Sequence, residues 1–164
     1  MLTFTRDFTD GGTVRFTIDG VAVTKLIQRW TFRFDDYTGV YRGLYKVIES
    51  CGDAPATTTY TDATITITQA ANSITIATIE SNGNSCTYSG DYTQSGQFGQ
   101  SVGRFTCTNG LSGGNFPPSR VPPFYSNMKV TTSDFRAYFD GGVTNGCSIS
   151  GNVVGIRQTP GESQ

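Results

Sequence analysis

Three short stretches with one shared pattern constrain the fold of this chain more than any other feature. Residues 86–90 and 147–151 both read Cys-x-apolar-x-Gly, and residues 103–107 carry the same pattern in reverse. Because side chains alternate between the two faces of a strand, each pattern puts its cysteine, apolar residue and glycine on one face. The motifs therefore predict paired strands of a closed sheet that are joined through cysteines.

Composition favours β structure and argues against nucleic acid as a partner. Only 15% of the 164 residues are charged and the formal net charge is -1, so the chain has no basic surface for phosphates. Thr, Ser, Gly and Asn are abundant while Lys and Glu are scarce, which disfavours helices. We expect an all-β chain with one main domain and no membrane span.

The four cysteines point to an oxidising compartment. With no histidine and no C-x-x-C pair to form a metal or redox site, two disulfides are expected, against the alternative of free thiols in the cytosol. No signal sequence is recognised in residues 1–20, so an export signal is expected upstream or already removed. The lack of an N-x-S/T acceptor favours a bacterium. We expect an extracellular, cell-surface or periplasmic protein.

The apolar pattern predicts an N-terminal hairpin and a larger barrel. Val14, Phe16 and Ile18 alternate before the turn pair Asp19-Gly20, and a change of phase predicts a bulge near Lys25-Leu26. The predicted division is a hairpin unit over 1–38, a disulfide-stapled domain over 39–158 and a tail over 159–164. Its strands are predicted at 40–51, 60–69, 73–81, 85–94, 100–108, 126–132, 134–140 and 146–157. About eight such strands favour an antiparallel up-and-down meander closed into a barrel, with a β-sandwich as the alternative.

The cysteines also predict a register for this barrel. Cys51 opposite Cys147 and Cys86 opposite Cys107 align like residues with like, and opposed residues are close enough for disulfides. The expected pairs are Val47 with Gly151, Tyr45 with Val153, Gly43 with Gly155, Tyr88 with Phe105 and Gly90 with Gly103. The first strand of the barrel would then pair with the last. The connectivity Cys51–Cys86 with Cys107–Cys147 remains open.

Two parts of the chain resemble modules of large secreted proteins of proteobacteria. The first part is similar to the closing strands of a β-rich repeat module, through Leu2-Thr3-Phe4-Thr5, Gly12-Thr13-Val14, Ile18-Asp19-Gly20-Val21, Thr24-Lys25 and Ile27-Gln28-Arg29 with Phe32. The second part, from Tyr41 to Arg157, resembles a cysteine-containing β domain that can follow it, through Thr93-Gln94-Ser95-Gly96 and Gly103-x-Phe105-x-Cys107. The resemblance implies a secreted location and a β architecture, and it carries over no enzymatic activity. By architecture alone the barrel is lipocalin-like.

Catalytic candidates are few. The absence of histidine removes the usual base of Ser and Cys hydrolases and the commonest zinc ligand, so we expect no enzyme, no metal and no cofactor. A glycoside hydrolase needs two carboxylates, and Glu49 and Glu80 are the candidates outside the tail. Solvated side chains beside turns are the alternative interpretation of both.

The segment 110–127 is the best binding candidate because it is long, carries four prolines and interrupts a tightly turned domain. Phe116, Arg120, Phe124 and Tyr125 are its expected contact residues. The alternative is that the aromatic residues cap an open end of the barrel.

Three functions remain open at this point. The first is a non-catalytic module for extracellular adhesion or assembly, with a protein partner or a second copy bound by strand addition into a polymer or filament. The second is a lipocalin-like binder of a small apolar ligand, and the third is an enzyme acting on carbohydrate.

Overall fold

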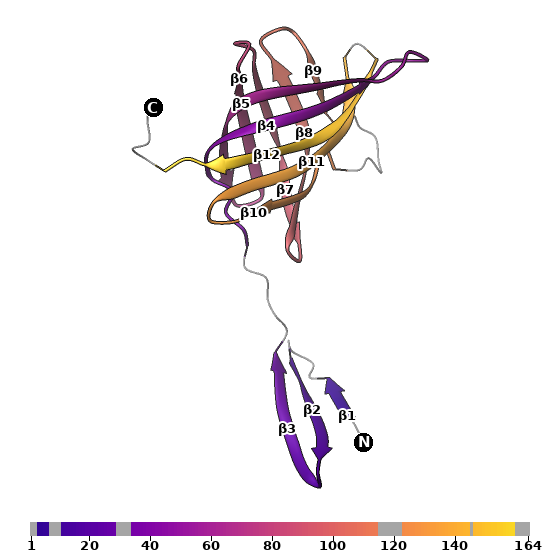
Figure 1. Ribbon diagram of the computed structural model, residues 1–164, viewed down its shortest axis with the longest axis vertical. Helices are drawn as coiled ribbons and strands as arrows, with labels where there is room; N and C mark the ends of the chain where they lie inside the picture. The colour runs from indigo at the N-terminus through magenta and orange to yellow at the C-terminus, as the bar shows by residue number, and fades with distance from the viewer. Residues whose placement is uncertain (1–2, 7–10, 29–33, 115–122, 145, 160–164) are drawn as a thin grey trace. The chain divides into compact units, whose positions relative to one another are not determined.

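The computed structural model describes residues 3–6, 11–28, 34–114, 123–144 and 146–159, and these residues form strands and turns without a helix. The chain divides into two compact units, Met1–Arg33 and Phe34–Gln164. Figure 1 shows an N-terminal sheet in the first unit and a barrel in the second. The prediction of an all-β barrel with an N-terminal hairpin is confirmed.

The N-terminal sheet has three antiparallel strands, β1 (Thr3–Arg6), β2 (Gly11–Ile18) and β3 (Val21–Gln28), in that spatial order. Asp19 and Gly20 both have positive φ, 52° and 81°, as a type I′ turn requires. The predicted bulge near Lys25-Leu26 is wrong, because β2 and β3 pair without a break from the turn to Gln28. Leu26 is 83% exposed, so the change of apolar phase reflects a sheet with apolar residues on both faces.

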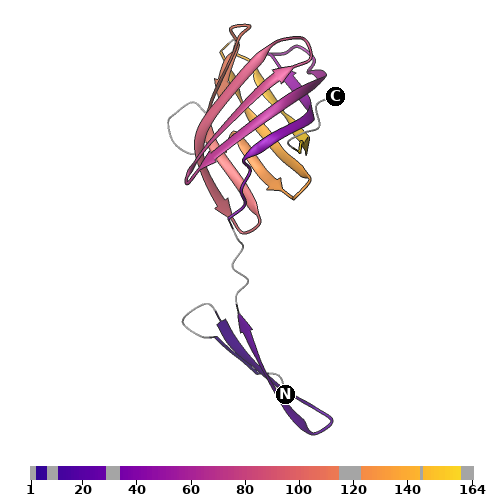
Figure 2. The same cartoon turned by 90° about the vertical axis from the view of Figure 1, so that its left-hand side faces the viewer.

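The second unit is a closed antiparallel barrel of eight long strands. These are β4 (Gly39–Ser50), β5 (Thr57–Ala70), β6 (Ser73–Glu80), β7 (Ser85–Ser95), β8 (Phe98–Cys107), β10 (Tyr125–Val130), β11 (Asp134–Val143) and β12 (Ser148–Arg157). Each strand pairs with its sequence neighbour, and β12 pairs with β4 to close the ring (Figure 2). The short β9 (Ser112–Gly114), which was not predicted, pairs with β8 and β11 beside the β8–β10 seam.

Both disulfides and both predicted registers are confirmed. Cys51 bonds Cys147, Cys86 bonds Cys107, and no described cysteine is free. The predicted partners face one another in the barrel: Val47 with Gly151, Tyr45 with Val153, Gly43 with Gly155, Tyr88 with Phe105 and Gly90 with Gly103. The first disulfide lies beyond the last pair of the β4–β12 seam, and the second joins the ends of β7 and β8 that lie next to each other.

The core fills the barrel because alternate residues of each strand point inward. Tyr37 belongs to this core although it precedes β4: it is fully buried and its hydroxyl donates to the Met128 carbonyl at 2.8 Å. Its ring packs against Tyr92 and Phe135. Residues 34–38 therefore lie in the barrel unit, which begins earlier than the predicted boundary after residue 38.

The glycine of each motif is explained by close packing between strands. A Cβ on Gly151 would lie 1.8 Å from the carbonyl oxygen of Lys46 on β4 and 2.8 Å from the Phe139 ring. A Cβ on Gly103 would lie 2.2 Å from the Ser89 carbonyl oxygen. The Cys-x-apolar-x-Gly pattern thus combines a bridge, a core side chain and a place where two strands approach each other too closely for any side chain.

Candidate functional site

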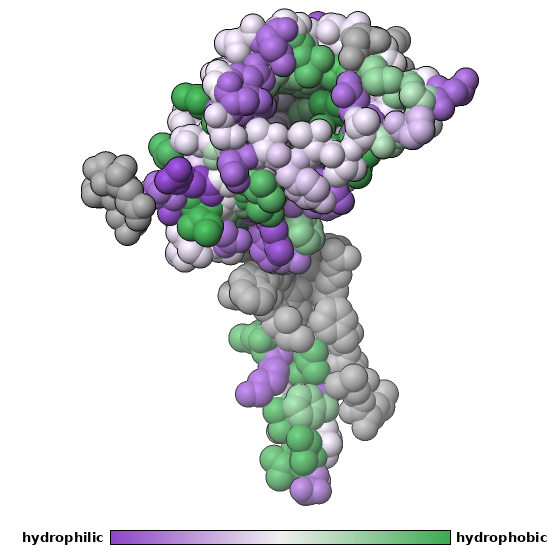
Figure 3. All heavy atoms as spheres, turned by 45° about the horizontal axis from the view of Figure 1, so that its top comes forward, coloured by the Kyte–Doolittle hydropathy of each residue, from purple (hydrophilic) through white to green (hydrophobic). Residues whose placement is uncertain are grey.

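A cavity of about 210 Å³ opens at the end of the barrel that carries the disulfides, and we call it the mouth cavity. Figure 3 shows a hollow at this end with hydrophobic residues inside it and hydrophilic residues on the rim. Its apolar lining comes from Tyr45, Val47, Ile76, Tyr88, Phe105, Leu111, Phe124, Tyr125, Phe139 and Ile149. Its polar lining comes from Glu49, Thr61, Thr78, Glu80, Asn84 and Asn109, beside Cys86 and Cys107.

Aromatic rings form the floor of the mouth cavity. The Tyr88 ring stacks on Phe124 at 5.3 Å between centroids and meets Tyr125 edge-on at 4.8 Å. Tyr45 packs against Phe139 at 6.1 Å. The floor of the mouth cavity is therefore an apolar surface of aromatic rings packed against one another.

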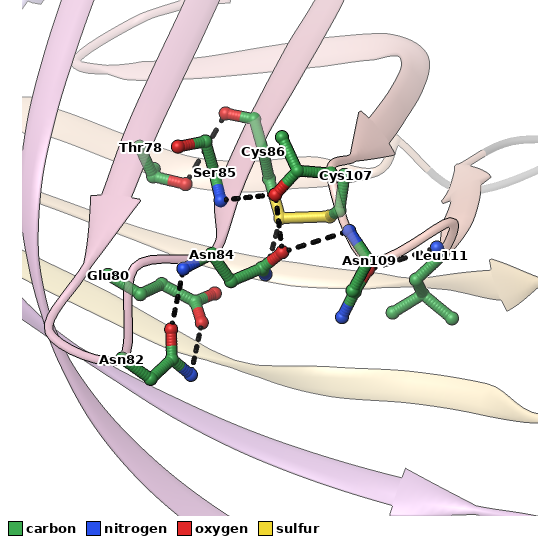
Figure 4. The surroundings of a disulfide bond; sticks show 10 residues. Thr78, Glu80, Asn82, Asn84, Ser85, Cys86, Cys107, Asn109 and Leu111 are labelled. Carbon is green, nitrogen blue, oxygen red and sulfur yellow. Dashed lines mark hydrogen bonds between the residues drawn. A yellow bond between two sulfur atoms is a disulfide. The ribbon is translucent and has the colours of Figure 1, made fainter.

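The rim is held by hydrogen bonds around the Cys86–Cys107 disulfide (Figure 4). Asn84 Oδ1 accepts from the Thr108 hydroxyl at 2.9 Å and from the Asn109 backbone N–H at 3.2 Å, and Asn84 Nδ2 donates to Cys86 Sγ at 3.5 Å. These bonds tie the β6–β7 turn to the residues that follow β8. The polar rim is therefore arranged before any ligand arrives.

Two carboxylates and one buried hydroxyl give the cavity its charge and polarity. Glu49 and Glu80 line it from β4 and β6, and Glu80 Oε2 accepts from Asn82 Nδ2 at 3.1 Å. The Tyr45 hydroxyl is buried and makes no hydrogen bond of normal geometry, although the Tyr125 hydroxyl is its polar neighbour. Burial, with a smaller contribution from the negative charge of Glu80, raises the pKa of Tyr45, so this phenol stays neutral.

The structure places the predicted binding residues differently from expectation. Phe124 and Tyr125 are not exposed contact groups: they are 3% and 5% exposed and pack in the barrel core. The reason is that β10 begins at Tyr125 and closes the barrel against β8, which turns these rings toward the axis. This arrangement matches the alternative interpretation of the segment, in which its aromatic residues cap an open end of the barrel. Phe116 and Arg120 lie outside the described residues.

The sequence did not predict the mouth cavity, although its cysteine motifs mark the strands around it. Glu49 and Glu80, the predicted carboxylates, do line one cavity, but a volume of about 210 Å³ is below the roughly 300 Å³ of pockets for drug-sized ligands. Glu49, Cys51 and Cys147 place ligand atoms within 4.8 Å of one another. Both sulfurs are in the disulfide, so this trio offers no thiolate to a metal.

A second hollow lies on the outer face of the barrel, across β11, β12, β4, β5 and β6. This outer groove has a volume of about 830 Å³ and mixes charged with aliphatic side chains. Its exposed aliphatic residues are Leu44, Ile79, Val154 and Ile156, between Arg42, Arg136, Asp62 and Asp134. Such a surface has both apolar area and opposite charges, and no described strand covers it.

The N-terminal sheet presents a different kind of site, the free edge of β3. The residues that flank a two-residue type I′ turn exchange hydrogen bonds, so Ile18 and Val21 form such a pair. Hydrogen-bonded and non-hydrogen-bonded pairs alternate along an antiparallel register, so the backbone N–H and C=O groups of Ala22, Thr24 and Leu26 point away from β2. No described strand pairs with that side of β3.

Comparisons with known proteins add no assignment. No protein-family model matches the chain, and no curated protein matches it. The described part of the chain contains no helix with the length and apolar character needed to cross a membrane.

Proposed function

We propose that this chain is a non-catalytic secreted β module for extracellular assembly, and that copies join through the free edge of β3. The observation that carries the proposal is the contrast between the two units. The barrel pairs every long strand on both sides, whereas no described strand pairs with the second edge of the eight-residue β3. An open edge of this length is a template for another strand.

The side chains of the N-terminal sheet support the same proposal. Val21 and Leu26 are 65% and 83% exposed on β3, and Ile18 is 56% exposed on β2. A three-stranded sheet needs a buried apolar face for independent stability. Addition of a strand from a second copy would extend the sheet and cover part of this area.

A second copy can pair with β3 without placing like charges opposite each other. In an antiparallel pair centred on Thr24, Ala22 would face Leu26 of the other copy, and Lys25 would face Val23. The outward backbone groups of Thr24 from both copies would then exchange two hydrogen bonds. The arrangement is isologous, and the second edge of the sheet at β1 leaves room for further growth into an array.

The two disulfides are compatible with an extracellular or periplasmic location, where such bonds persist. The resemblance to secreted proteobacterial modules supports export and assembly in the same way. The small mouth cavity does not favour a carrier of large apolar ligands. It is also small for a glycoside hydrolase, which must hold groups on both sides of the bond that it cleaves.

The test is the oligomeric state of the full chain and of two matched variants. Thr24→Pro removes one N–H from the free edge without removing a β2–β3 hydrogen bond, whereas Thr24→Val keeps the N–H. Light scattering and negative-stain microscopy should show assemblies for the wild type and for Thr24→Val, and monomers for Thr24→Pro. A wild-type chain that stays monomeric at high concentration, or a Thr24→Pro variant that assembles normally, would contradict the proposal.

A further inference from the structure

One row of side chains across the outer groove has opposite charges at its two ends and apolar residues between them. In the register of the barrel, Arg136 on β11 is the neighbour of Val154 on β12. Val154 is in turn the neighbour of Leu44 on β4, and Leu44 is the neighbour of Asp62 on β5. All four side chains are exposed on the outer face. The four strands lie side by side in Figure 1, so the row crosses the groove from a positive end to a negative end.

The two charged ends of this row are available to a partner. Neighbouring strands lie about 4.8 Å apart, so the three intervals from β11 to β5 put roughly 14 Å between the backbones of Arg136 and Asp62. The two side chains cannot reach each other over that distance within one copy. In the described part of the chain, neither side chain makes a hydrogen bond or an ion pair with another residue.

We propose that the outer groove binds a second copy of this chain, face to face, about a two-fold axis that runs between β12 and β4 along the strands. This axis places Arg136 of each copy opposite Asp62 of the other copy, and Val154 opposite Leu44. The interface is isologous, because one surface complements itself. Strands that run along a shared axis agree with the aligned packing of two sheets. The groove lies wholly within the barrel unit, so the proposal does not depend on strand addition at β3.

The rows on either side of the first row fit the same axis. One row holds Asp134, Ile156, Arg42 and Thr64, and the other holds Tyr138, Asn152, Lys46 and Tyr60. Ile156 would pack on the aliphatic stem of Arg42 from the other copy, and Tyr138 would meet Tyr60. Asp134 would face Thr64, and Lys46 would face Asn152. The axis therefore brings no two like charges opposite each other in any of the three rows.

The balance of charge in the groove favours a second copy over a strongly charged partner. The described lining contains two arginines and three carboxylates, which are Arg42, Arg136, Asp62, Glu80 and Asp134. A polyanion or a basic protein would meet repelling groups along with attracting ones, whereas a second copy presents the opposite sign at a fixed position. The same contact would remove exposed aliphatic side chains of the groove from water.

The contact is expected to be weak. Exposed ion pairs contribute little free energy, and a patch of a few aliphatic side chains is smaller than a standard interface. We expect a dissociation constant on the order of 0.1–1 mM, so that a dilute chain with its β3 edge blocked is monomeric and a concentrated one forms dimers.

The experiment is sedimentation equilibrium of the full chain up to millimolar concentration, with Thr24→Pro present in every sample to block the β3 edge. The parent Thr24→Pro chain should form dimers. Asp62→Arg or Arg136→Asp, added alone, places like charges opposite each other and should weaken the dimer at least tenfold. The control Asp91→Arg makes the same change on the exposed face of β7, outside the groove, and should leave the dimer unchanged.

An equal mixture of the two groove variants gives the sharpest result. The mixture should form a heterodimer with the affinity of the parent, because the two arginines of the Asp62→Arg chain then meet the two aspartates of the Arg136→Asp chain. A mixture that associates no better than either variant alone would overturn the proposed axis.

Two other outcomes would overturn the proposal. If the concentrated parent chain forms no dimer while circular dichroism shows an intact fold, the groove does not bind a second copy. If Asp91→Arg weakens the dimer as much as Asp62→Arg does, the interface lies elsewhere. Both outcomes leave strand addition untouched, because that proposal is tested by comparing the wild type with Thr24→Pro in dilute solution.

Discussion

Two tyrosine hydroxyls inside the barrel have opposite surroundings. Tyr37 donates to the Met128 carbonyl at 2.8 Å, which satisfies a buried group between β10 and the start of the barrel unit. Tyr45 is buried in the mouth cavity without a hydrogen bond of normal geometry. A buried polar group costs stability when it is unpaired and contributes modestly when it is paired.

The two residues therefore should respond differently to loss of the hydroxyl. Tyr37→Phe is expected to lower the free energy of unfolding by about 1 kcal/mol, because the Met128 carbonyl loses its donor. Tyr45→Phe is expected to leave it unchanged or raise it by about 1 kcal/mol in the ligand-free protein. Urea unfolding of both variants measures this difference, and equal destabilisation by the two substitutions would contradict it.

Gly151 is the residue at which the barrel tolerates a side chain least. A methyl group there would lie 1.8 Å from the Lys46 carbonyl oxygen, which belongs to a paired backbone and cannot turn away. We expect Gly151→Ala to destabilise the protein by about 1–3 kcal/mol. Asn152→Ala, at the exposed neighbouring position, should change stability by less than about 0.5 kcal/mol. Thermal unfolding of the pair checks the contrast.

At the scale of elements, each disulfide reinforces a different seam. Cys51–Cys147 holds the first strand of the barrel to the last, whereas Cys86–Cys107 holds consecutive strands that a short turn already keeps together. The sequence separations are 96 and 21 residues, so the first bridge restricts the unfolded chain more strongly.

Removal of the bridges should follow this order. By loop-closure entropy, Cys51→Ser with Cys147→Ser should cost about 5 kcal/mol, and Cys86→Ser with Cys107→Ser about 3 kcal/mol. Denaturant unfolding of the two double variants measures both losses. A greater loss from the shorter loop would contradict the loop-closure explanation.

At the scale of the whole molecule, buried tyrosines make the fold sensitive to alkali. Burial raises the pKa of Tyr37, Tyr45, Tyr88 and Tyr125 above the ordinary value of 10.0, because a phenolate is poorly solvated inside the barrel. The neutral phenol is the form that the folded state favours. Their contribution is complete below pH 10 and is lost as the pH rises above it.

We therefore expect stability to fall steeply between pH 10 and 12. Each of these tyrosines should remove about 1.4 kcal/mol per pH unit once the unfolded chain ionises and the folded one does not. Unfolding in urea at pH 9 and pH 11, followed with the ultraviolet absorbance of tyrosinate, measures the effect. Titration of all the tyrosines near pH 10 while the protein stays folded would contradict this prediction.

Local patterns predicted the eight long strands and favoured the observed disulfides and barrel closure, but a second connectivity and a β-sandwich stayed open until the structure decided them. Alternation and turn residues depend on nearest neighbours, and the matched motifs bring the cysteines into register once strands pair in order. Local patterns did not predict that Phe124 and Tyr125 are buried, because a proline-rich stretch with aromatic residues has the same pattern whether its rings face solvent or a core. The predicted bulge near Lys25-Leu26 is wrong for a related reason. The alternation of apolar residues indicates which side chains share a face only when one face of the sheet is buried.

The amino-acid sequence by itself determined an all-β chain with a leading hairpin and favoured a disulfide-stapled antiparallel barrel, because those features follow from the alternation, turns and cysteine spacing of adjacent strands. Only the tertiary structure decided which rings enter the barrel, that Glu49 and Glu80 line one aromatic cavity, and that no described strand pairs with the outer edge of β3. These depend on the tilt of the strands and on how the ring closes, which bring together side chains far apart in sequence, and no local pattern encodes that distance.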